Sequence, residues 1–125
     1  GRDFYDRLID ALLAAGVAPW LCCYHWDLPQ ALQERGGWAA RDTAYYFADY
    51  AERLAEFYGD RVGHFILLNE PNVAALLGHL LGVHAPGEAD LGRFGAALHH
   101  FNLATGLGLE RLRSAGSWQL GTVLN

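Results

Sequence analysis

The chain has 125 residues, of which 52% are hydrophobic and 13% aromatic, enough to build one folded core. Its net charge is −5 and its nine basic residues are all scattered arginines, so we expect no nucleic-acid partner. No apolar run approaches the roughly 18 residues that cross a bilayer, and no leader peptide is recognisable, so we expect no membrane partner either.

Seven regular elements are predicted from the spacing of apolar residues and from the residues that start and stop each run. In chain order they are a helix over 4–15, a strand over 18–24, a helix over 43–58, a strand over 63–68, a short helix over 73–81, a helix over 91–114 and a strand over 118–124. Asp3 and Asp42 are expected to cap the first two long helices, which Gly16 and Gly59 end. The polar segment 25–41 is expected to be a functional loop.

The alternation of helices and strands predicts an α/β fold with a parallel sheet of about three strands. Such a sheet would have two unpaired edges, and the chain opens in a helix and closes in a strand. We therefore expect residues 1–125 to be an internal fragment of a single larger domain. A partial (β/α)₈ barrel fits best; the alternative is an open doubly wound sheet, which usually carries a glycine-rich phosphate loop that this chain lacks.

Polar residues follow two of the expected strands at the point where each strand ends. The apolar run that begins at His64 ends in Asn69-Glu70-Pro71, and the strand over 18–24 is followed by His25-Trp26-Asp27-Leu28-Pro29. Because parallel strands end at the same edge of a sheet, these exits predict one shared pocket. Strict alternation would send Asn69 and Glu70 to opposite faces, so irregular backbone is expected near Pro71.

The two cysteines, Cys22 and Cys23, are neighbours on an expected strand and point to opposite faces. They cannot form an ordinary disulfide with each other, so we expect a reducing, cytoplasmic compartment. The six histidines and two cysteines show no spacing typical of a metal site, so no metal site is expected.

Several motifs together carry a resemblance to a known family. They are Asp3–Ile9, Tyr24–Pro29, Arg35–Trp38, Phe47–Ala51, Gly59–Val62, Asn69–Pro71, Gly82–Gly87 and His99-His100. In these motifs the chain resembles the family-1 glycoside hydrolases, the β-glucosidases and their relatives. The resemblance implies a segment from the second helix to the fifth strand of a barrel. It departs from the family at Asn72, where many members carry a tryptophan that lines the leaving-group side.

The resemblance also implies roles for individual residues. Retaining glycosidases use two carboxyl groups about 5–5.5 Å apart, and Glu70 resembles the one that acts as acid/base. Asn69 resembles the amide that binds the sugar 2-hydroxyl, and His25 the imidazole that binds another sugar hydroxyl, with Trp26 beside it as a further substrate contact. Asn125, at the exit of the last strand, is a candidate for the aglycone subsite.

The second carboxylate, the nucleophile, has no counterpart in this chain. The family carries it in a Thr-Glu-Asn-Gly-like context, and no Thr-Glu pair occurs here. We therefore expect a parent enzyme that hydrolyses terminal β-glucosides or β-galactosides, and no turnover by these 125 residues alone. The expected partner is a small carbohydrate, with no metal or organic cofactor implied and the oligomeric state open. The alternatives are a vestigial sugar-binding protein, and a transglycosylase or 6-phospho-β-glycosidase using the same pocket.

Overall fold

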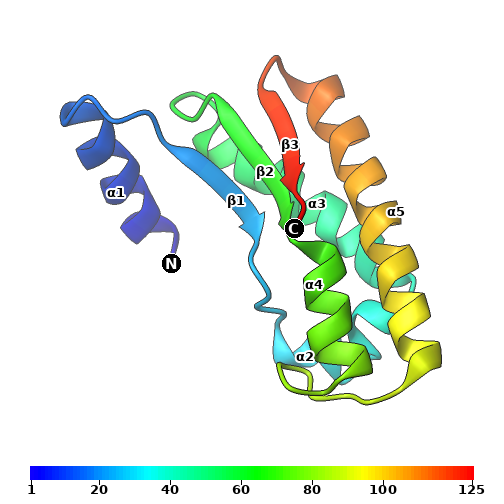
Figure 1. The fold of residues 1–125 in the computed structure, drawn as a ribbon. Helices are drawn as coiled ribbons and strands as arrows, with labels where there is room; N and C mark the ends of the chain where they lie inside the picture. Colours follow the sequence, from blue (N-terminus) through cyan, green and yellow to red (C-terminus); the bar gives the residue numbers. More distant parts are fainter.

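The computed structural model describes residues 1–125 and has helices and strands alternating along the chain (Figure 1). The elements are α1 (Arg2–Ala14), β1 (Trp20–Tyr24), α2 (Gln30–Gln33), a 3₁₀ turn η1 (Gly37–Ala39), α3 (Asp42–Tyr58), β2 (His64–Asn69), α4 (Pro71–Ala75), a π-helical turn η2 (Leu76–Leu80), α5 (Leu91–Ala115) and β3 (Gln119–Val123). The strands form one parallel sheet in the order β1-β2-β3, which confirms the predicted topology.

The expected helix caps are only partly correct. Neither Asp3 nor Asp42 is an N-cap, because α1 begins after Gly1 and α3 after Arg41. Both aspartates instead lie in the first turn of their helices, where their negative charge is favourable beside the unpaired N–H groups. Gly59 ends α3 as predicted. The segment 25–41 is not a plain loop, since it contains α2 and η1.

Helices α3 and α5 pack against each other and cover one face of the sheet. Leu67 of β2 lies between them, and a Cβ added at Gly108 of α5 would stand 3.3 Å from its Cδ1 atom. The face that α3 turns to this core is made largely of alanines, such as Ala51 and Ala55, which allow close approach. Phe47 belongs to this core, and Leu54 and Phe57 pack against it. Tyr50, which lies on the same helix, is 50% exposed.

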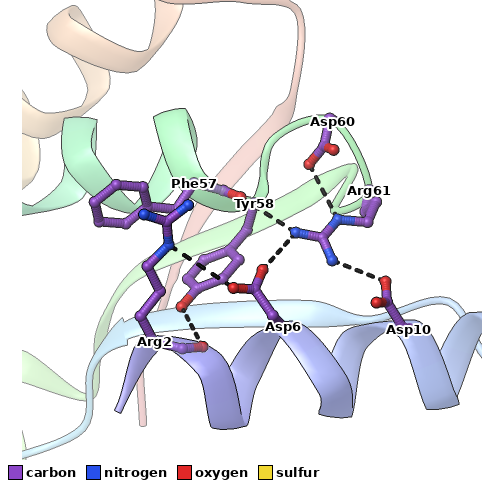
Figure 2. Close-up of polar contacts among 7 residues, drawn as sticks. All are labelled: Arg2, Asp6, Asp10, Phe57, Tyr58, Asp60 and Arg61. Carbon is purple, nitrogen blue, oxygen red and sulfur yellow. Dashed lines mark hydrogen bonds and ion pairs between the residues drawn. The ribbon is translucent and has the colours of Figure 1, made fainter.

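Helix α1 lies beside the sheet, with Ile9 buried in the core, and polar contacts join it to the end of α3 and the turn before β2 (Figure 2). Arg61, in the turn after α3, donates to Asp6 at 2.7 Å and to Asp10 at 2.8 Å, both on α1, and to Asp60 at 3.2 Å. The hydrogen bonds that Arg61 donates raise the pKa of its guanidinium above the ordinary value; the bond to Asp6 has the largest effect, followed by those to Asp10 and Asp60. This cluster is at the opposite end of the sheet from the strand exits.

Candidate active site

The ends of the three strands bring the predicted site residues together at one edge of the sheet. Asn69 Nδ2 lies 3.3 Å from His25 Nε2, which joins the exits of β2 and β1. Asn125 Nδ2 donates to Glu70 Oε1 at 3.4 Å, which joins the exits of β3 and β2. Trp26 Nε1 donates to the Asn69 carbonyl at 2.8 Å. The five residues singled out from the sequence therefore converge, while their roles in catalysis stay predictions.

The backbone turns sharply at Glu70, as expected from the need to place Asn69 and Glu70 at one site. Glu70 has φ 44° and ψ 57°, in the left-handed region, and the pairing of β2 with β3 shifts register between Ile66 and Asn69. Pro71 follows as the first residue of α4, where its missing N–H costs nothing. The alternation of side chains between the two faces of the sheet therefore ends at Glu70, the candidate acid.

Asn72, in the first turn of α4, lies beside this site. Its Nδ2 donates to the Asn125 carbonyl at 3.2 Å, so it supports the residue that contacts Glu70. Its Oδ1 is buried and has no hydrogen-bond partner. An unpaired amide oxygen at this position can accept a hydrogen bond, which the tryptophan indole usual in the resembling family cannot do.

Glu88 joins three segments of the chain, which are α2, η2 and the start of α5. Its carboxylate accepts hydrogen bonds from His79 Nδ1 at 2.6 Å, Arg93 Nη2 at 2.6 Å and Gln33 Nε2 at 3.2 Å. Burial raises the pKa of Glu88, but the hydrogen bonds and charges of Arg93 and His79 outweigh burial and hold the pKa below its ordinary value. No short motif signals this contact, because its partners come from three separate segments.

Trp38, the last residue of the Arg35–Trp38 motif, is a core residue. It is 3% exposed, and its ring packs on Phe101 with centroids 4.3 Å apart. Its carbonyl accepts a hydrogen bond from His100 Nδ1 at 2.9 Å. Trp38 therefore contributes to the packing of the core.

A cavity of about 530 Å³ lies beside the end of β1 and the segment that follows it. It lies between β1 and α3, with Cys23, Tyr24 and Tyr50 among its lining residues, and it includes neither His25 nor Glu70. The edge over the exits is open because three strands do not close around it. We place the site by its convergent polar groups, since volume alone does not identify chemistry.

The structure contains no group of three or more His, Cys, Asp or Glu side chains placed to hold a metal ion. It also has no helix with the length and apolar character needed to cross a membrane.

Comparisons with known proteins agree on one family. The family model described as "Glycosyl hydrolase family 1" matches residues 1–125. Thermostable beta-glucosidase B of Thermobispora bispora is 59% identical over 125 residues, which are 100% of this chain and 26% of that protein. Beta-glucosidase A of Thermotoga maritima is 47% identical over 126 residues, covering 100% of this chain and 28% of its own length.

Solved structures are similar to the same degree. The beta-glucosidase from Thermotoga maritima in complex with deoxynojirimycin superposes with a TM-score of 0.96 at 46% identity, over 99% of this chain and 29% of that one. A psychrophilic beta-glucosidase from Micrococcus antarcticus gives a TM-score of 0.97 at 52% identity, over 99% of this chain and 26% of that one. The chain thus spans about a quarter of the length of the curated relatives it matches.

Proposed function

Because the chain belongs to glycosyl hydrolase family 1 and has the fold of part of a (β/α)₈ barrel, we propose that it is an internal segment of the catalytic domain of a retaining β-glycosidase, with Glu70 as the acid/base. The observation that best supports this proposal is the position of Glu70 in the fold. It stands where parallel strands end, next to Asn69 and in contact with Asn125. Barrel enzymes position their reacting groups at this edge.

In the proposed reaction Glu70 acts twice. It first donates a proton to the bridging oxygen as the bond to the sugar breaks, while a second carboxylate attacks the anomeric carbon. It then takes a proton from the water that releases the sugar. Each step needs the Glu70 carboxyl within hydrogen-bond reach of an oxygen on the leaving-group side.

The second carboxylate is proposed to come from outside residues 1–125. Glu52 and Glu56 lie on α3 and pair with Arg111 and Arg53, and Glu88 is engaged by the loop contacts described above. Glu34 ends α2 and Glu110 is exposed on α5. None of these carboxylates lies at a strand exit, so the 125 residues alone are expected to show no turnover.

The convergence of Asn69, His25, Trp26 and Asn125 at the strand exits supports a proposal for the sugar contacts. The Asn69 amide is proposed to bind the 2-hydroxyl, a contact that strengthens at the transition state, and His25 a neighbouring hydroxyl. Trp26 and Asn125 are proposed as further contacts on the glycone and aglycone sides. The proposed substrate is a small carbohydrate with a terminal β-glucoside or β-galactoside. No contact in this chain favours the vestigial or the phospho-glycoside alternative.

The test is Glu70→Gln in the full-length protein. A general acid contributes about 10²–10⁴-fold, so kcat/KM for an alkyl β-glucoside should fall by about that factor. With a 2,4-dinitrophenyl β-glucoside, whose leaving group departs without a proton, kcat/KM should change little. Glu110→Gln, an exposed change on α5, is the matched control and should alter neither value. An equal loss for both substrates, or no loss, would contradict the role of Glu70.

A further inference from the structure

Two residues other than glycine have positive φ in this structure, and both lie at strand exits. They are Trp26, at φ 77°, two residues after β1, and Glu70, at φ 44°, immediately after β2. A bulky side chain rarely adopts this backbone region, and such residues persist only where surrounding contacts hold them. We therefore expect the contacts of Trp26 to stabilise its strained backbone conformation.

These two residues meet at a single peptide bond, the one that joins Asn69 to Glu70. Its carbonyl oxygen accepts a hydrogen bond from Trp26 Nε1 at 2.8 Å. Its N–H, on Glu70, donates to the Val123 carbonyl of β3 at 2.9 Å. Both polar groups of this peptide are therefore held, the carbonyl by a residue that follows β1 and the N–H by a residue of β3. The Glu70 carbonyl is held as well, by Ala74 N at 2.9 Å.

The Trp26 ring is itself held in place. It packs against the His84 ring, with centroids 5.5 Å apart, and against the His25 ring at 5.7 Å. An indole has only one hydrogen-bond donor, and here that donor is used by the Asn69 carbonyl. Trp26 can therefore offer a sugar its ring face but not its N–H group.

We propose that Trp26 is a positioning residue for Glu70: its indole N–H holds the Asn69–Glu70 peptide in the left-handed turn that aims the Glu70 carboxyl. This rests on the proposed acid/base role of Glu70. Without the indole N–H, the Asn69 carbonyl loses its partner and the peptide is held from one side only. The carboxyl then moves relative to the bridging oxygen, and the loss falls on proton transfer rather than on sugar binding.

The structure supplies a matched control for this hydrogen bond. Trp118 Nε1 donates to the Gly59 carbonyl at 2.9 Å, the same bond type, at the end of the sheet where β2 and β3 begin. Trp26→Phe and Trp118→Phe each remove one indole N–H. Trp26→Phe in the full-length protein should lower kcat/KM for an alkyl β-glucoside by about 10–100-fold, the cost of a misplaced group. Trp118→Phe should leave the ratio of kcat/KM values for alkyl and 2,4-dinitrophenyl glucosides unchanged.

The leaving-group dependence separates positioning from general damage. For Trp26→Phe, kcat/KM with the 2,4-dinitrophenyl glucoside should fall by no more than about threefold, because that substrate needs no proton. If Trp26→Phe does not fold, site-specific replacement by 3-benzothienylalanine keeps the ring shape and removes only the N–H. Equal losses for both substrates, or no loss, in a folded variant would overturn the proposal.

Measuring Glu70→Gln in the same assays as Trp26→Phe distinguishes the acid/base role of Glu70 from the positioning role of Trp26. If Glu70→Gln shows the leaving-group dependence and folded Trp26→Phe does not, the positioning role is wrong and the acid/base role stands. If Glu70→Gln itself shows no such dependence, the acid/base assignment fails, and the positioning role fails with it.

Discussion

Replacing Glu88 by Gln is expected to loosen the segment between η2 and α5 beside the strand exits. The Glu88 side chain is 20% exposed and accepts hydrogen bonds from His79, Arg93 and Gln33. The backbone around it is anchored too, since Glu88 N donates to Gly78 O and Asp90 N to His79 O, each at 2.9 Å. Glutamine keeps the size of the side chain but removes its charge.

The expected loss follows from the strength of the bonds. A hydrogen bond to a charged group contributes about 1.5–3 kcal/mol and a neutral one about 0.5–1.5 kcal/mol. The two short bonds, from His79 and Arg93, therefore lose about 1 kcal/mol each, or about 2 kcal/mol together. This corresponds to an about 30-fold larger equilibrium constant for local opening.

Amide hydrogen exchange of the full-length protein measures this opening. At pH 7 the amides of Glu88 and Asp90 should exchange about 30-fold faster in Glu88→Gln than in the wild type. Because the folded pKa of Glu88 lies below the ordinary value of 4.5, the stabilisation is present above pH 4.5 and is lost as the pH falls through the folded pKa. The difference between the two proteins, compared at equal pH, should therefore vanish in strong acid.

The control is Glu56→Gln. Glu56 pairs with Arg53 at the same 2.6 Å distance, but that pair is exposed on α3 and should contribute nothing measurable. Unchanged exchange in Glu88→Gln at pH 7 would refute the reasoning, as would a difference that persists in strong acid.

Three further predictions concern the core, a thiol and helix α1. Leu67 is fully buried and packs on Gly108, so Leu67→Ala should lower the free energy of unfolding, measured in urea, by about 2–5 kcal/mol. Leu124→Ala, at an exposed position, should not lower it, and similar urea midpoints for the two variants would contradict this prediction. Burial raises the pKa of Cys23 to about 12, so it should resist a thiol reagent at about pH 8 until the protein unfolds, and rapid labelling of the folded protein would show it is accessible. Arg61→Gln should speed proteolysis within α1, since the contacts to Asp6 and Asp10 are lost; unchanged cleavage would mean that α1 is held by other contacts.

The sheet could be predicted from the sequence because its signals are local. Apolar runs ending at Tyr24 and Leu68, each followed by a proline within a few residues, predict β1 and β2. The exact helix starts could not be predicted, since Asp3 and Asp42 are equally favourable as caps or within a first turn. The exposed position of Tyr50 also depends on how α3 packs against α5, which periodicity alone does not determine.

The site was predictable as a set of residues but not as a set of contacts. The motifs at the exits identified His25, Asn69 and Glu70, and the expectation of irregular backbone near Pro71 is confirmed by the left-handed turn at Glu70. The bond from Trp26 to the Asn69 carbonyl joins residues 43 apart in sequence, and it forms only when β1 and β2 pair. The Glu88 contacts likewise exist only once three separate segments have packed together.

The sharpest measurement of the role of Glu70 uses Glu70→Ala in the full-length protein with a 2,4-dinitrophenyl β-glucoside and added azide. Removing the carboxylate leaves space and removes the negative charge that repels an anion, so azide can attack the sugar held on the nucleophile. We predict that azide accelerates turnover and that the product is the β-glucosyl azide. No acceleration, or release of free glucose only, would contradict the assignment of Glu70 as the acid/base.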